Sequence, residues 1–150
     1  MSMISFVLSR LLIVEDDLNA LTGLRELLGE EGFFVRGVVN GRQAIEAAKQ
    51  ERFDIVLCDY SLPGMDGLQV CRELKRLQPH LALFLVTAYR NLEVLNAARL
   101  CGIEKVIAKP LVIAELFDTL TAAITRLREK GQYHLTKKEG GVSAAISICV

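Results

Sequence analysis

The sequence has no excess of one charge and no long apolar run, and these absences narrow the class of protein. Its 18 basic and 18 acidic side chains give a formal net charge of 0, whereas nucleic-acid and membrane surfaces usually carry a basic excess. No apolar stretch reaches the roughly 18 residues that a membrane-spanning helix needs. We therefore expect this chain to contact neither nucleic acid nor a membrane.

The sequence also lacks the cysteine and histidine spacing of a zinc site. None of the four cysteines belongs to a Cys-x-x-Cys pair, and neither histidine is near a cysteine. This spacing excludes the usual zinc-binding motifs. Cys58 lies in an apolar run, where a thiol behaves as a small buried hydrophobic group. Isolated cysteines of this kind indicate a reducing, cytoplasmic setting.

The composition is that of one folded domain. Of the 150 residues, 51% are hydrophobic and 24% are charged, which is the opposite of the balance that disorder requires. Residues 10–130 carry the regular pattern and are expected to form the domain. Residues 1–9 are interpreted as a short leader, and residues 131–150 as a solvated tail or truncated linker.

Five short apolar runs alternate with amphipathic helical stretches. Such runs, rich in Val, Ile, Leu and Phe, are typical of strands buried on both faces. Strict alternation predicts right-handed crossovers. The expected fold class is therefore α/β, a (βα)5 doubly wound parallel sheet of order 2-1-3-4-5, whose cleft opens at the carboxyl ends of the first and third strands. The predicted strands are residues 11–14, 33–39, 54–58, 81–86 and 103–108, and the predicted helices are residues 18–31, 42–51, 68–78, 91–100 and 112–129.

Acidic side chains follow the first and third predicted strands. Glu15, Asp16 and Asp17 come directly after the first strand, and Asp59 follows the third. Helix capping and turn formation explain some of them, and Asp17 is well placed to cap the next helix. Three adjacent acids, however, repel one another unless a cation lies among them. Because the two strands are neighbours in the predicted order, these acids predict a site for a hard cation such as Mg²⁺.

A hydroxyl and an amine are expected at the same edge of the sheet. Thr87 follows the fourth run and Lys109 follows the fifth. Alone, the hydroxyl would bond to the local backbone and the lysine would be solvated. Together with the acids they suit phosphoryl transfer, because a metal, a lysine and a hydroxyl can neutralise and orient the equatorial oxygens of the transferred group. One carboxylate must then remain free to accept that group.

Over about residues 10–129 the chain resembles the receiver domain of bacterial two-component response regulators. The string Asp-x-x-x-Pro-Gly-Met-Asp-Gly beginning at Asp59, together with the correctly spaced Lys-Pro pair, is highly specific. The resemblance implies the flavodoxin-like receiver fold. The matching segments are Leu-Leu-Ile-Val-Glu-Asp-Asp (11–17), Asp-Ile-Val-Leu-Cys-Asp-Tyr-Ser-Leu-Pro-Gly-Met-Asp-Gly (54–67), Leu-Val-Thr-Ala (85–88) and Ala-Lys-Pro-Leu (108–111).

The resemblance implies an acceptor and a metal site. Asp59 would accept the phosphoryl group. Glu15 and Asp16 would hold Mg²⁺ together with Asp59, with Asp16 as a direct ligand, and the backbone carbonyl of Ser61 would be a further ligand. Such a domain signals rather than acting as an enzyme, because it catalyses only its own phosphotransfer and autodephosphorylation.

The resemblance also implies the partners of the phosphoryl group. Thr87 would donate a hydrogen bond to it and Lys109 would pair with it, while the peptide bond before Pro110 is often cis in this family. The donor would be a phosphohistidine on a sensor histidine kinase or phosphotransfer protein, or a small acyl phosphate. A homodimer through the fourth helix, fifth strand and fifth helix would be a further possibility.

One position departs from the family pattern. The residue three before the lysine is usually Tyr or Phe and moves with the threonine during activation, but here it is Val106. Tyr89, two residues after Thr87, is the candidate to move instead. The output surface is expected on the fourth helix, fifth strand and fifth helix, with a rim that includes Arg90, Arg99, Glu104 and Lys105.

Three other functions are alternatives to a phosphorylated receiver. A silent receiver that only docks or dimerises is kept open by Val106. An aspartate-nucleophile phosphatase typically has a second acid two residues after the nucleophile, where this chain has Ser61. A flavin or dinucleotide module is disfavoured because no Gly-x-Gly-x-x-Gly follows the first strand, and the acids there would repel a phosphate unless a metal is present.

Overall fold

The computed structural model describes residues 9–130, which form alternating strands and helices. The predicted leader (1–9), apart from Ser9, and the predicted tail (131–150) lie outside the described residues. Every predicted boundary agrees with the observed one to within one residue. The elements are β1 (Arg10–Val14), α1 (Leu18–Glu30), β2 (Phe34–Val38), α2 (Gly41–Gln50), β3 (Ile55–Asp59), α3 (Gly67–Leu77), β4 (Ala82–Thr87), α4 (Leu92–Leu100), β5 (Ile103–Ala108) and α5 (Ile113–Glu129).

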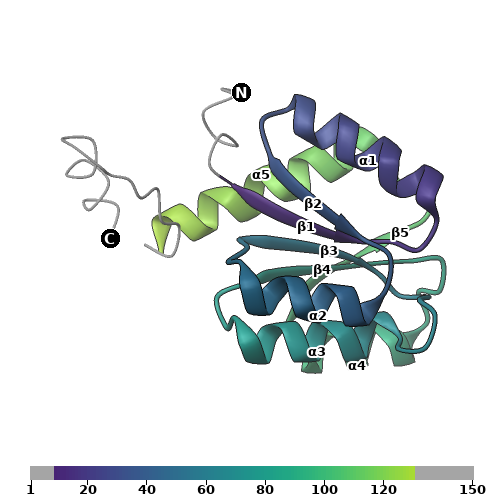
Figure 1. Cartoon of the computed structure of the whole chain (residues 1–150). Coiled ribbons are helices and arrows are strands. Elements are labelled where there is room, and N and C mark those ends of the chain that lie inside the picture. Colours follow the sequence, from purple (N-terminus) through teal and green to yellow (C-terminus); the bar gives the residue numbers. More distant parts are fainter. Residues whose placement is uncertain (1–8, 131–150) are drawn as a thin grey trace.

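The strands form one parallel sheet between two layers of helices (Figure 1). The order is β2-β1-β3-β4-β5, which confirms the predicted doubly wound topology. Helices α1 and α5 pack on one face, where their leucines meet Ile13, Leu57 and Phe84 of the sheet. Helices α2, α3 and α4 cover the other face. Each face therefore has its own apolar core, and all five strands end at the same edge.

Polar side chains begin four of the helices, as intrinsic capping preferences require. Asp17 caps α1 as predicted, since its side chain accepts hydrogen bonds from the backbone N–H groups of Asn19 and Ala20. Asn40, Asp66 and Asn91 cap α2, α3 and α4, and Asp66 forms a reciprocal capping box with Gln69. These caps fix where the loops leave the carboxyl edge of the sheet.

The expectation that every strand is buried on both faces is wrong for the two edge strands. β1, β3 and β4 are buried almost throughout, but β5 is buried only at Ile103 and β2 only at Val38. An edge strand has a neighbour on one side only, so side chains near its open side stay in contact with water. In β5, Glu104 lies at this surface and forms an ion pair with Arg126 of α5.

No helix within residues 9–130 is long and apolar enough to cross a membrane. In the same part of the chain, Cys58, Cys71 and Cys101 are free thiols, and Cys58 is fully buried, as its apolar run predicted.

Candidate functional site

The carboxyl edge of the sheet brings the predicted residues together. Glu15 follows β1, Asp59 ends β3, Thr87 ends β4 and Lys109 follows β5. Since β1 and β4 flank β3 in the sheet, Glu15 and Thr87 lie on either side of Asp59. The parallel topology, rather than sequence proximity, therefore creates this cluster.

Three carboxylates converge at this edge. One ligand oxygen from each of Glu15, Asp16 and Asp59 lies within 4.8 Å of the other two. Glu15 and Asp59 are buried, whereas Asp16 is exposed. Carboxylates at this separation repel one another in a poorly solvated setting. Oxygen donors of this kind suit a hard divalent cation such as Mg²⁺, which would relieve the repulsion.

The pKa of Glu15 records this crowding. Burial is the largest influence and raises the pKa, and the nearby charges of Asp59 and Asp16 raise it further. Opposing them, Glu15 Oε2 accepts a hydrogen bond from the backbone N–H of Asp17 at 3.0 Å, and Lys109 contributes positive charge. The net pKa is raised. The backbone bond also holds one oxygen of Glu15 in place, a contact that the sequence pattern did not predict.

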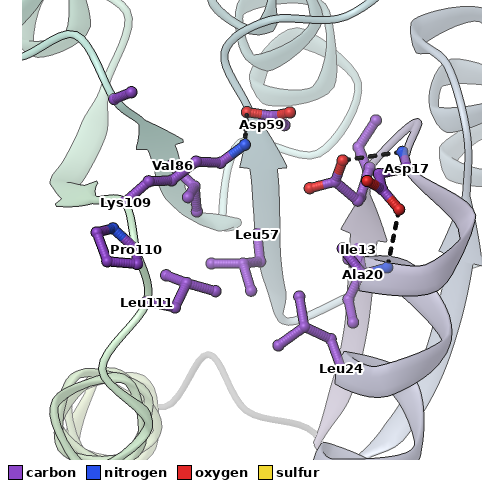
Figure 2. Close-up of a pocket in the computed structure, with 13 residues that line it drawn as sticks. Ile13, Asp17, Ala20, Leu24, Leu57, Asp59, Val86, Lys109, Pro110 and Leu111 are labelled. Atoms are coloured by element: carbon purple, nitrogen blue, oxygen red, sulfur yellow. Dashed lines mark hydrogen bonds and ion pairs between the residues drawn. The ribbon is translucent and has the colours of Figure 1, made fainter.

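Lys109 reaches directly to Asp59. Its Nζ lies 3.1 Å from Asp59 Oδ1, as Figure 2 shows. Burial lowers the pKa of Lys109, but the hydrogen-bonded ion pair with Asp59 and the charges of Glu15 and Asp16 outweigh burial, so the pKa is raised. The backbone N–H of Lys109 also donates to the carbonyl of Thr87 at 3.0 Å. The cation that would meet a phosphoryl group is thus already held against the proposed acceptor.

The Thr87 hydroxyl is held by the next loop. Its Oγ1 accepts a hydrogen bond from the backbone N–H of Tyr89 at 2.9 Å and donates a long one to the Tyr89 carbonyl at 3.5 Å. Thr87 is buried, while the Tyr89 side chain is 59% exposed. The side chain predicted to contact the phosphoryl group is therefore tied to the backbone of the residue predicted to move.

The remaining predicted residues lie around this centre. Ser61 is exposed, two residues beyond the end of β3, and the peptide bond between Lys109 and Pro110 is cis. Val106 is partly buried, packs against the core formed with α2, α3 and α4, and lines a hollow of about 300 Å³ on the β5 side. Arg90 and Lys105 line the same hollow.

A groove that the sequence did not predict extends from the acids. Its volume is about 630 Å³, and Figure 2 shows it between α1 and the β5–α5 connection. Lys109 and Asp59 lie at one end, whereas Leu24, Leu57 and Leu111 line the space beyond. Leucines at helical spacing on α1 predicted only core packing, because the sequence does not report how closely α1 approaches the connection.

Asp54 is a second buried acid, directly before β3, but it lies outside this cluster. It precedes the first residue of the strand, so it is at the amino edge of the sheet. Its Oδ2 accepts a hydrogen bond from the backbone N–H of Arg10 at 2.8 Å. The carboxyl edge, in contrast, combines three acids with a lysine and a hydroxyl.

Comparison with known proteins identifies relatives of this chain. Residues 11–121 match the family described as the response regulator receiver domain. The transcriptional regulatory protein ZraR of Escherichia coli K12 is 36% identical over 114 residues, which cover 76% of this chain and 26% of that protein. The sporulation initiation phosphotransferase F of Bacillus subtilis is 32% identical over 111 residues, which cover 74% of this chain and 90% of that protein. The chain thus spans about a quarter of the ZraR proteins but most of the phosphotransferase.

Solved structures share the fold. A CheY-like receiver domain protein from Methanospirillum hungatei superposes with a TM-score of 0.79 at 26% identity, covering 82% of this chain and 98% of that one. The response regulator TrrA of Thermotoga maritima, solved in complex with Mg²⁺ and BeF, superposes with a TM-score of 0.70 at 26% identity, covering 77% of this chain and 98% of that one.

Proposed function

The chain belongs to the response regulator receiver domain family, and we propose that Asp59 accepts a phosphoryl group in a Mg²⁺-dependent reaction. Receiver domains are signalling domains of two-component systems rather than classical enzymes, and they generally interact with histidine kinases or phosphotransfer proteins. The proposed donor is the phosphohistidine of such a partner or a small acyl phosphate. The donor's reactive group would enter at the carboxyl edge of the sheet.

The charged groups around Asp59 support this proposal. A carboxylate, Asp59, has a lysine at 3.1 Å and two further carboxylates within 4.8 Å. In the proposed step, an oxygen of Asp59 attacks phosphorus, the bond between phosphorus and the donor nitrogen or oxygen breaks, and its electron pair leaves with the donor. Lys109 would then pair with the transferred oxygens, and Thr87 would donate a hydrogen bond once it leaves Tyr89.

Glu15, Asp16 and Asp59 would hold the metal, with the backbone carbonyl of Ser61 as the further proposed ligand. A bound Mg²⁺ would neutralise charge on the transferring group. The three convergent oxygen donors support this assignment, as does the Mg²⁺ complex of the TrrA relative. Buried Glu15, whose pKa is raised, would ionise more readily with a cation beside it.

Intact mass measurement tests the acceptor. Incubation with acetyl phosphate and Mg²⁺ should add one phosphoryl group to the wild-type chain and none to Asp59→Asn. The same reaction with a chelator should leave both masses unchanged. A folded wild-type chain that binds Mg²⁺ but never gains mass, even with candidate kinases, would instead favour the silent receiver that docks or dimerises without phosphorylation, which Val106 keeps open.

The proposed switch runs from Thr87 through Tyr89. When Thr87 turns toward a phosphoryl group, its hydrogen bonds to the Tyr89 backbone must lengthen, which frees the start of the β4–α4 connection. The hollow beside Val106, where receivers usually carry an aromatic side chain, gives this segment room to move. Proposed output then lies on α4, β5 and α5, the surface whose rim includes Arg90, Arg99, Glu104 and Lys105.

Amide exchange tests the switch separately from phosphorylation. Treatment with BeF₃⁻ and Mg²⁺ should change exchange in the β4–α4 connection of the wild type, and Tyr89→Ala should reduce that change. Tyr60→Phe is the control, because the Tyr60 side chain packs against the core formed with α2, α3 and α4. An unaltered response in Tyr89→Ala would remove Tyr89 from the switch.

The extent and partners of the domain are proposals as well. Residues 10–130 would form the receiver, with 1–9 as leader and 131–150 as tail. Homodimerisation through α4, β5 and α5 is proposed as one use of the output surface. The free thiols of the described residues support a reducing, cytoplasmic setting.

A further inference from the structure

The groove beside Asp59 continues from the polar cluster into an apolar space. At its mouth stand Glu15, Asp17, Asp59 and Lys109. Its volume, about 630 Å³, lies in the range of small-molecule sites, roughly 300–1,000 Å³. The apolar side chains that line it include Ala20, Leu24, Leu57, Val86, Pro110 and Leu111.

We propose that this groove binds the apolar acyl chain of a small acyl phosphate, so that donors with a longer chain phosphorylate Asp59 faster than acetyl phosphate does. This inference rests on the proposed function, since it names a class of donor for the same acceptor. The groove and the acceptor are continuous, because Asp59 and Lys109 belong to the groove's own lining. A donor could therefore place its phosphoryl group beside Asp59 and its chain against Leu24 and Leu111.

The charges at the mouth of the groove determine which substituents the donor's acyl chain can carry. Lys109 and the metal would pair with the phosphoryl oxygens, but Glu15 and Asp17 would repel a second anionic group. Beyond the mouth the named lining side chains are apolar, so a polar substituent would lose its hydrogen bonds to water there without finding replacements. The preferred donor is thus an acyl phosphate with an uncharged hydrocarbon chain.

Phosphoryl transfer from the acyl phosphate to Asp59 needs no further reactant. An Asp59 oxygen forms a bond to phosphorus while the bond between phosphorus and the acyl oxygen breaks. The electron pair leaves with that oxygen, and a carboxylate departs. Acetyl and butyryl phosphate release carboxylates of nearly equal basicity, so their intrinsic reactivities are matched. A difference between their phosphorylation rates on this protein therefore reports contact between the groove and the donor's acyl chain.

The test compares initial rates of Asp59 phosphorylation with acetyl and butyryl phosphate below saturation, measured by intact mass. Each methylene buried contributes about fourfold, so two that are mostly buried should give butyryl phosphate an advantage of about tenfold. Equal rates would overturn the groove proposal and leave the proposed function intact. No adduct from either donor would overturn the groove proposal, and no adduct from candidate kinases as well would overturn the proposed function.

A variant that fills the groove makes the test specific. Ala20 lines the groove from the exposed side of α1, so Ala20→Leu should reduce the butyryl-to-acetyl ratio toward one. Thr22→Leu is the matched control, since Thr22 is exposed on α1 but is not part of the lining. A tenfold ratio that persists in Ala20→Leu would mean that the acyl chain binds outside the groove, which would contradict the proposal.

A readout without phosphoryl transfer separates binding from rate. Butylphosphonate carries an uncleavable bond to phosphorus and should shift the methyl resonances of Leu24, Leu57 and Leu111, whereas methylphosphonate should leave them in place. Shifts confined to other methyl groups, such as that of Ile45 on α2, would also overturn the proposal.

Discussion

Asp54 directly precedes the buried strand β3 and Asp59 ends it, yet the charges that surround the two side chains differ. Each side chain belongs to a residue that is 5% exposed. Asp54 accepts a hydrogen bond from the Arg10 backbone, and the charges near it are those of Arg52, His80 and Arg10. Asp59 has Glu15 and Asp16 beside it, with Lys109 as the opposing charge.

This comparison shows that burial of a carboxylate does not identify its role. Surrounded by cations and bonded to a strand, Asp54 is satisfied by the protein itself. Asp59 shares its space with two other acids and one lysine, a set of oxygen donors that suits a divalent cation. A buried acid among like charges is the one that points to chemistry, and that distinction requires the neighbours to be known.

Removal of the Lys109 side chain, which contacts Asp59 and not Asp54, should have the largest effect on phosphorylation. Lys109→Ala takes away the cation at 3.1 Å from Asp59, and loss of one such group from a transferring centre typically slows transfer by about 100-fold. The rate of Asp59 phosphorylation by acetyl phosphate checks this. Lys49→Ala, which removes an exposed lysine paired with Glu46, is the control and should keep the wild-type rate. A wild-type rate in Lys109→Ala would detach Lys109 from the reaction.

The Asp59 end should also be less tolerant of added volume. A Cβ on Gly67 would meet the backbone oxygen of Asp59 at 2.4 Å and the Cα of Tyr60 at 2.8 Å. We expect Gly67→Ala to lower the free energy of unfolding by about 2 kcal/mol. Nothing lies within 4 Å of a Cβ built on Gly23 in α1, so Gly23→Ala should stabilise by about 0.5–1 kcal/mol. Urea unfolding measures both, and similar signs for the two changes would contradict this account of α3 packing.

Asp54 should matter for folding but not for phosphorylation. Asp54→Ala leaves the Arg10 backbone N–H without its side-chain acceptor at the sheet edge, which should reduce the free energy of unfolding by about 1–2 kcal/mol. Its phosphorylation rate, measured well below the unfolding transition, should match the wild type. A variant that is stable but unreactive would mean that the amino edge contributes to the site.

The smallest expected effect is on the pH dependence of the unfolding free energy, which Mg²⁺ should alter through Glu15 but not through Asp54. Burial raises the pKa of both Asp54 and Glu15 in the folded chain. The stability that protonation of such groups provides is fully present below their ordinary pKa values and is lost as pH rises through the folded pKa. Unfolding free energies followed from about pH 4 toward neutrality should therefore fall slightly as each group ionises.

Added Mg²⁺ should remove the Glu15 part of that fall and leave the Asp54 part. Glu15→Gln and Asp54→Asn separate the two contributions. If Mg²⁺ removed the part that Asp54→Asn also removes, the metal would not be bound where the three acids converge.

Most of the fold and the members of the site could be predicted from sequence. Apolar runs and caps such as Asp17 report local structure, and the parallel order then brings Glu15, Asp59 and Lys109 to one edge. Details that depend on how elements approach one another could not be predicted. The hydrogen bond from Tyr89 to Thr87, the exposure of β5 and the groove beside Leu24 all depend on distances between packed elements, which hydrophobic periodicity does not encode.

Mapping the phosphorylated residue tests the central claim most directly. After reaction with acetyl phosphate and Mg²⁺, borohydride reduces an aspartyl phosphate to homoserine, which peptide mass spectrometry locates. We expect homoserine at position 59 in wild type and in Asp54→Asn alike, and unmodified aspartate at position 54 of the wild type. Homoserine at position 54, or at any residue outside the cluster at the carboxyl edge, would contradict it.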